Sequence, residues 1–166
     1  MKTLVVYSSR HGSTAQYAQW IAEDLGVSAL PIQKAGRQDL EGAEQLVIGS
    51  SVQIGKLTIS SWLQSHWASL QGKKLVFFSV SGTKPEETEK IGEIFSKSMT
   101  DEMQGQMKRF SLLGRMRMDD MPRIIRWMMK NASRMEKDPE KKANMMAEFD
   151  GVKRENVGPV VSAARG

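Results

Sequence analysis

The stretch Ser8-Ser9-Arg10-His11-Gly12-Ser13-Thr14 decides the fold, because it joins a short apolar run to a helical pattern. The apolar run, residues 4–7, is continuous and partly β-branched, as in a strand buried on both faces of a parallel sheet. After the stretch, apolar residues recur at helical spacing as far as Gly26, which can end the helix. The first backbone N–H groups of that helix would then face the loop, so the pattern predicts an anion-binding turn.

The residues of the turn suit a phosphate. Gly12 removes a side chain that would hold a phosphate away, and three hydroxyl groups lie beside it, those of Ser9, Ser13 and Thr14. The stretch matches neither the nucleoside-triphosphate loop nor the dinucleotide fingerprint. Taken alone, the stretch could also be an ordinary strand-to-helix turn with capping hydroxyls, which is the less favoured of the two interpretations.

The same design recurs twice along the chain. The apolar runs at 45–51 and 74–80 also end in serine and glycine, and each is followed by a helical pattern. Strands that alternate with helices predict right-handed crossovers and a parallel sheet with helices on both faces. Ligands of such sheets bind at the carboxyl ends of the strands, where the strand order reverses. The sequence therefore predicts three hydroxyl-rich loops at one edge.

Other elements are expected around this pattern. A short edge strand is expected at 27–32, a helix at 59–70, and another from a start at 83–86 to residue 98. A fifth strand is expected at 110–114. A closing helix within 152–164 would be interrupted by Gly158-Pro159.

Composition limits the class of protein. The 166 residues suit a single domain over 1–166, and the absence of cysteine excludes disulfides, thiolate catalysis and iron–sulfur clusters. We expect no metal site. The N-terminus has no signal-peptide pattern, and no apolar run approaches the roughly 20 residues of a membrane span. We expect a cytoplasmic protein, at most peripheral to the inner face of the membrane.

Charge divides the chain unevenly. Residues 1–96 carry nine basic and nine acidic side chains, whereas residues 97–142 carry twelve and seven, so the net charge of +5 arises in the middle. Eleven of the twelve methionines lie at or after Met99. This predicts a basic, methionine-rich helical segment at about 115–149.

A helix is predicted within this segment, after capping residues Asp119 and Asp120. Its four basic residues fall within roughly 80° of a helical wheel, and apolar residues line the other side: Met121, Ile124, Ile125, Met128, Ala132 and Met135. The apolar face could form core on the domain's own sheet or against a second copy in a homodimer. Alternatively the helix meets anionic lipid or a quinone pool, with Trp127 at the interface. We expect no nucleic-acid partner, because no recognisable reading module is present.

The three loops resemble those of the flavodoxin-like superfamily over residues 1–100. The resemblance implies a five-stranded doubly wound sheet of order 2-1-3-4-5 with FMN at its switch point, an arrangement for which flavodoxin itself is a standard example. It also implies a set of cofactor-binding residues: Ser9, Arg10, His11, Gly12, Ser13 and Thr14 at the phosphate; Ser51, Val52, Gln53, Ile54 and Gly55 at one flavin face; and Ser81, Gly82 and Thr83 at the pyrimidine edge. Arg10 and His11 replace the usual hydroxyl residues of the phosphate loop.

The whole chain is similar to the flavodoxin-type, menaquinone-dependent protoporphyrinogen oxidases of haem synthesis. The similarity lies in residues 47–55, in 79–80 with Lys84-Pro85-Glu86, and in the Arg- and Met-rich helix. It implies an FMN-dependent oxidoreductase that passes electrons from protoporphyrinogen, a hydrophobic substrate, to a quinone-like acceptor. The flavin would carry the chemistry, so no catalytic side chain is expected.

Two other functions stay open at this stage. The first is a flavodoxin-type electron carrier that has protein redox partners and no substrate of its own. The second is a flavin-free binding protein that keeps the fold. Carriers usually present an acidic surface to their partners, so the net positive charge favours the enzyme.

Overall fold

The structure, a computed structural model, describes residues 1–166 and divides them into two compact units. The first unit consists of residues 1–114 and 152–166, and the second of residues 115–151.

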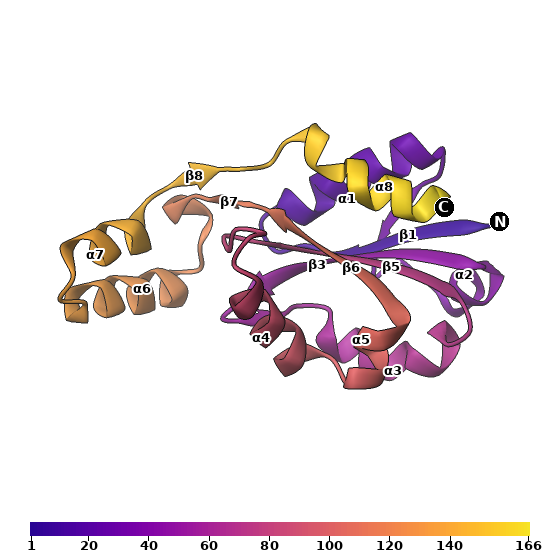
Figure 1. The fold of residues 1–166 in the computed structure, drawn as a ribbon, viewed down its shortest axis with the longest axis horizontal. Coiled ribbons are helices and arrows are strands. Elements are labelled where there is room, and N and C mark those ends of the chain that lie inside the picture. The colour runs from indigo at the N-terminus through magenta and orange to yellow at the C-terminus, as the bar shows by residue number, and fades with distance from the viewer. The chain divides into compact units, whose positions relative to one another are not determined.

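Five parallel strands form the sheet of the first unit, in the order β2-β1-β3-β5-β6 (Figure 1). Their bounds are Thr3–Ser8 for β1, Ala29–Pro31 for β2, Gln45–Gln53 for β3, Lys74–Ser81 for β5 and Met107–Leu113 for β6. A short strand, β4 (Lys56–Leu57), pairs antiparallel with the end of β3. If only the parallel strands are numbered, their order is the expected 2-1-3-4-5. Strand β4 was not predicted from the sequence.

Helices cover both faces of this sheet (Figure 1). On one face lie α1 (Ser13–Leu25) and α8 (Gly158–Arg165), the latter preceded by the 3-10 turn η2 (Arg154–Val157). On the other face lie α2 (Arg37–Gly42), α3 (Ser60–Leu70), α4 (Thr88–Ser98) and α5 (Asp101–Gln106). Each face has its own buried apolar cluster, because successive residues of a strand point to opposite sides: Phe78 packs with Tyr17, whereas Phe77 packs with Phe95 and Leu63.

One glycine in β3 is required by close packing. Gly49 pairs in register with Phe78 of β5, and a Cβ atom at Gly49 would lie 2.2 Å from Phe78 Cζ. Only glycine leaves room for the buried ring, so this contact fixes how Phe78 packs over β3.

Several boundaries in the first unit differ from the sequence prediction. Helix α4 begins at Thr88 and not near Thr83, because residues 84–87 form a turn in which the Lys84 N–H donates to Glu87 Oε2 at 2.9 Å. Strand β6 begins at Met107, earlier than expected, and helices α2 and α5 were not anticipated. Gly158-Pro159 does not interrupt the closing helix but starts it, since proline is tolerated in a first turn.

The second unit is a small helical segment closed by a two-stranded ribbon. Strand β7 (Arg115–Met116) pairs antiparallel with β8 (Phe149–Asp150), and the 3-10 turn η1 (Met118–Asp120), α6 (Arg123–Met135) and α7 (Pro139–Met146) lie between them. Asp119 and Asp120 lie inside η1, so the expectation that they cap α6 is wrong; Pro122 holds the N-cap position. Asp138 does cap α7, accepting a hydrogen bond from the Glu140 N–H at 3.0 Å.

The apolar side of α6 does not form core. Ile124, Met128 and Met135 are exposed, and the only buried residue of the helix is Ser133. No helix of the chain is long and apolar enough to cross a membrane.

Candidate cofactor site

The loop after β1 leaves the positive end of α1 open. Gly12 is the N-cap residue of α1, with φ of 91°, and neither a capping side chain nor an acidic residue in the first turn competes for the helix N-terminus. A Cβ atom at Gly12 would meet nothing within 4 Å, so no other part of the protein crowds the turn at this residue. An uncapped helix N-terminus facing open space favours an anion.

Side chains of the same turn are partly fixed in place. Ser13 and Thr14 are buried at the start of α1, and the Ser9 hydroxyl accepts a hydrogen bond from the Gly12 N–H at 3.2 Å. Arg10 and His11 are exposed. The buried hydroxyls therefore shape the turn, while Arg10 and His11 lie at its outer side.

Ser51 joins the first loop to the second. Its hydroxyl lies 2.8 Å from Thr14 Oγ1, accepts from the Arg10 N–H at 3.2 Å, and donates to the Ser8 carbonyl at 3.3 Å. One side chain near the end of β3 thus contacts the last residue of β1, the loop after it and the first turn of α1, and so holds the two loops together.

Thr58 extends this hydroxyl network from the other side. Its Oγ1 lies 2.9 Å from Ser8 Oγ and 3.4 Å from Ser50 Oγ, and donates to the Ser51 carbonyl at 3.3 Å. Sequence analysis missed Thr58. Spacing gave no signal for it, because a two-residue turn at Ile54-Gly55 must first return the chain antiparallel to β3 before Thr58 lies beside Ser51.

A row of serines crosses the sheet beneath the loops. Ser8, Ser50, Ser79 and Ser111 occupy matching positions on β1, β3, β5 and β6. The Ser79 and Ser111 hydroxyls lie 3.1 Å apart. Small polar side chains at these carboxyl ends leave the edge of the sheet free of bulky groups.

The second loop presents an apolar side chain in a strained conformation. Ile54 has φ of 51° and is the only residue other than glycine with positive φ; Gly55 follows with φ of 70°. The Ile54 side chain is 69% exposed. A β-branched residue in the left-handed region is unfavourable, and such strain is found most often at functional sites. Val52 and Gln53, just before it, are half-buried.

The third loop is held by its own contacts. Ser81 Oγ accepts from the Thr83 N–H at 3.2 Å, and the Ser81 carbonyl accepts from the Gly114 N–H at 2.8 Å. Beyond it, a hydrogen bond from the Lys90 ammonium lowers the pKa of the Glu87 carboxyl, and the bond from the Lys84 N–H adds to this effect. These contacts anchor residues 81–87 as one turn.

The sheet brings all three loops to one edge. In the parallel pairing Ser8 lies beside Ser50, and Ser51 beside Val80, so the loops follow three adjacent strands at their carboxyl ends. The first two loops are also hydrogen bonded to each other, whereas the third contacts them only through the strands. The chain order reverses between β1 and β3, which makes this edge a topological switch point.

Comparison with known proteins agrees with this architecture. Residues 4–143 match the family described as "Flavodoxin domain". The chain therefore belongs to the flavodoxin-domain family, and it is a flavodoxin-like flavoprotein.

Particular relatives are more distant. The chain is 28% identical over 96 residues to "Protoporphyrinogen IX dehydrogenase [quinone]" of Escherichia coli (strain K12), a match that covers 52% of this chain and 53% of the relative. The chain thus spans about half the length of the curated relatives it matches.

Solved structures are similar in fold. A flavodoxin, WrbA-like protein from Agrobacterium tumefaciens has a TM-score of 0.50 at 17% identity, over 68% of this chain and 82% of that protein. A flavodoxin from the domain Archaea has a TM-score of 0.47 at 20% identity, over 67% and 83% of the two chains.

Membership of the flavodoxin-domain family indicates FMN as the cofactor. The residues present fit this group: the open N-terminus of α1 suits its phosphate, and residues 9–14, 51–55 and 81–83 include no acidic side chain that would repel it. Bound FMN supplies one- and two-electron transfer chemistry.

Proposed function

We propose that this protein is an FMN-dependent oxidoreductase that passes electrons from a hydrophobic substrate to a quinone-like acceptor. Residues 9–14 hold the phosphate, residues 51–55 contact one face of the flavin, and residues 81–83 reach its pyrimidine edge. We place the protein in the cytoplasm, in peripheral contact with the inner face of the membrane.

The observation that carries this proposal is the absence of aromatic side chains from the two flavin-facing loops. Residues 51–55 and 81–83 contain none, and the most exposed side chain among them is the aliphatic Ile54. An aromatic ring stacked on each flavin face suits a carrier that shields its cofactor. Aliphatic contact from one side leaves the other face accessible to a flat, apolar reactant.

Protoporphyrinogen is the substrate we favour, since a relative in Escherichia coli bears the name protoporphyrinogen IX dehydrogenase [quinone]. In each cycle the substrate would lose two electrons and two protons, and a quinone would take up two electrons and two protons to become a quinol. The chain's own residues orient the cofactor and control access to it. No side chain near the loops is required to store electrons.

The same fold supports a second function, an electron carrier with protein redox partners. The exposed Arg10 beside the phosphate turn is the observation in its favour, because a cation near a cofactor can steer an acidic partner; such a carrier would reverse the usual pairing of an acidic carrier with basic partners. The two functions differ in whether the flavoprotein reacts directly with small molecules.

Anaerobic mixing distinguishes them. The FMN-loaded protein is mixed with protoporphyrinogen, and bleaching of the flavin band at about 450 nm is followed. A naphthoquinone is then added. The proposed enzyme loses the band with substrate, recovers it with quinone and turns over repeatedly. A protein that retains FMN but exchanges electrons with neither compound is a carrier, and the proposal is then wrong.

A further inference from the structure

Helix α6 carries an exposed apolar stripe that no other part of the second unit covers. Ile124, Trp127, Met128 and Met135 are exposed by 61%, 63%, 44% and 83%. At 100° per residue these four positions fall within roughly 100° of the helix circumference. The buried Ser133 and the half-buried Ile125 and Met129 lie on the other side, where α6 packs against α7. The stripe is therefore a continuous surface along α6.

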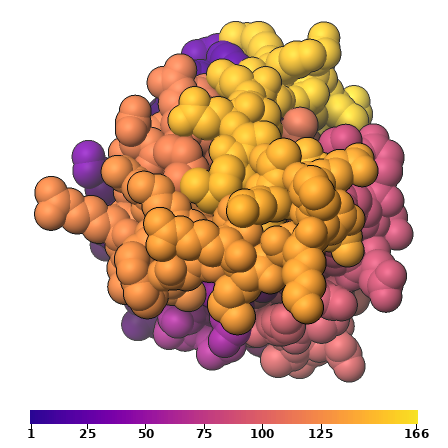
Figure 2. All heavy atoms as spheres, turned by 90° about the vertical axis from the view of Figure 1, so that its left-hand side faces the viewer, coloured from indigo at the N-terminus to yellow at the C-terminus, as the bar shows by residue number.

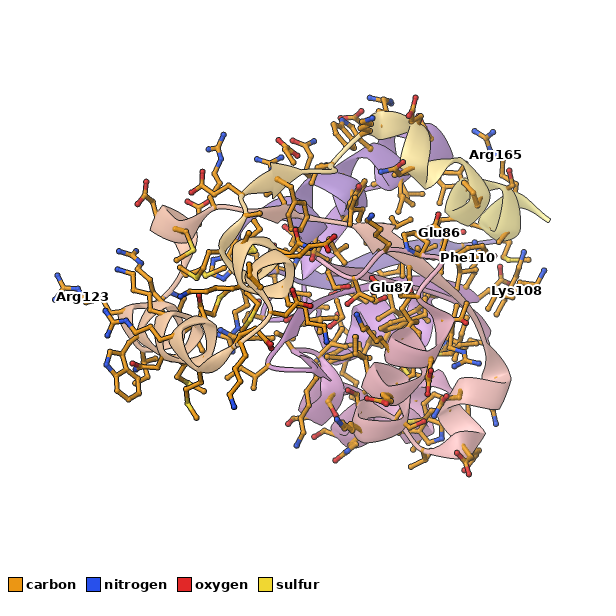
Figure 3. All side chains as sticks on the ribbon, turned by 60° about the vertical axis from the view of Figure 1, so that its left-hand side comes forward. Glu86, Glu87, Lys108, Phe110, Arg123 and Arg165 are labelled. Carbon is orange, nitrogen blue, oxygen red and sulfur yellow. The ribbon has the colours of Figure 1, made fainter.

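A basic row borders this stripe. Arg123, Lys130 and Arg134 are exposed, and α6 contains no acidic residue. Figure 3 shows Arg123 extending away from the α6 ribbon, and the orange atoms of the segment lie at the surface in Figure 2. Arg126 belongs less to this row, because its guanidinium donates to the Met121 carbonyl at 3.3 Å.

Charge selects the occupant of this surface. A second copy of α6 paired antiparallel would bring Arg123, Lys130 and Arg134 beside the same three cations, and α6 supplies no acid between them, so the stripe is ill-suited to pairing with itself. An anionic partner is required. A helix with an apolar stripe beside a basic row can lie in a membrane interface. Its apolar side chains then enter the boundary of the acyl chains, while its cations contact anionic headgroups. Flexible methionines suit such an irregular apolar medium, and tryptophan favours its border.

We propose that α6 is a peripheral docking surface for membranes that contain anionic phospholipid. The helix lies in the plane of the interface, with Ile124, Trp127 and Met128 toward the acyl chains and Arg123, Lys130 and Arg134 at the headgroups. This surface is independent of the reaction proposed above, and its test uses no enzymatic activity.

The test measures sedimentation of the 166-residue chain with vesicles. We expect binding to phosphatidylcholine vesicles that contain phosphatidylglycerol and little binding to phosphatidylcholine alone. Binding should weaken as salt is raised, because salt at about 0.1 M already screens the attraction between exposed charges that lie more than about 10 Å apart. In these experiments the triple variant Arg123→Glu, Lys130→Glu, Arg134→Glu should bind at least a hundredfold more weakly, since each cation near an anionic surface contributes roughly fivefold.

A matched variant controls for net charge. Lys34, Lys97 and Lys108 are exposed residues of the first unit, and changing all three to Glu alters the total charge by the same amount. This variant should keep most of its vesicle binding. Equal loss in both triple variants would mean that only bulk charge matters and would overturn the proposal.

The apolar stripe is tested separately. Ile124→Gln with Met128→Gln keeps the charge and should also reduce sedimentation with anionic vesicles. A wild-type protein that never sediments would end the proposal. So would a wild-type dimer that these two substitutions dissociate, because the stripe would then be occupied by a second copy.

Discussion

The substitution Gly12→Ala separates the phosphate-binding role of the first turn from its backbone geometry. Gly12 has φ of 91°, so alanine there costs about 1–2 kcal/mol of strain. The lost freedom of the unfolded chain offsets about 0.4–1 kcal/mol, which leaves a net destabilisation of about 1 kcal/mol. The new methyl group would meet no protein atom within 4 Å. Any further effect must come from what occupies the space in front of the turn.

The effect on FMN should exceed this strain. A hydrogen bond to a charged group contributes about 1.5–3 kcal/mol, so a methyl group that displaces the phosphate from one N–H weakens FMN binding roughly ten- to hundredfold. The apoprotein is titrated with FMN, and quenching of flavin fluorescence gives the dissociation constant. Riboflavin, which lacks the phosphate, should bind the variant and the wild type equally.

The matched control lies at the other end of the same helix. Gly26 has φ of 69°, and a Cβ atom there also meets nothing within 4 Å. Gly26→Ala should lower the free energy of unfolding by a similar amount and leave FMN affinity unchanged. Equal FMN affinities for the two variants, or equal losses for FMN and riboflavin, would refute the assignment of the phosphate to this turn.

Three further predictions follow from single contacts. Gly49→Ala forces a Cβ atom to within 2.2 Å of Phe78, so urea denaturation should show a loss of about 3 kcal/mol, the upper end of the usual cost of overpacking, and Phe78→Leu in the same chain should recover part of it. Ser51→Ala removes the hydroxyl bound to Thr14, so the free energy of unfolding should fall by about 1–3 kcal/mol and FMN should bind more weakly. Unchanged FMN affinity in this variant would show that the two loops are independent. Ile54→Asn relieves the left-handed strain, so thermal unfolding should show an apoprotein that is more stable by up to about 1 kcal/mol, while flavin binding weakens. Equal stabilisation of the apoprotein and the FMN-bound protein would show that Ile54 does not contact the flavin.

The sheet and the edge that carries the loops could be predicted because their signals are local and repeated. Three apolar runs that each end in serine and glycine specify buried parallel strands and place their loops together. Right-handed crossovers predict a parallel sheet but not the order of its strands; that order was implied by the resemblance to the flavodoxin-like superfamily, and the sheet agrees with it.

The hydrogen-bond network around Ser51 and Thr58 could not be predicted from spacing. Thr58 reaches Ser8 only after a hairpin at Ile54-Gly55 reverses the chain, and isoleucine is an unusual residue for that turn. The start of α4 was misplaced for a similar reason. Thr83 and Pro85 form a plausible helix start, but the Glu87 carboxylate binds the Lys84 N–H and delays the helix to Thr88.

The role of α6 could be stated from sequence only as a pair of alternatives. A helical wheel locates the apolar and basic faces but does not say which of them is covered. Exposure of Ile124, Trp127 and Met135 is a tertiary property, set by how little of α6 the small second unit can bury.

The measurement that most directly tests the central claim is a visible absorption spectrum. The purified protein is incubated with FMN, separated from free FMN by gel filtration and scanned. We expect the protein to retain flavin bands at about 375 and 450 nm, with one FMN bound to each chain. A colourless protein that is still folded would contradict it, and the fold would then serve a function without flavin.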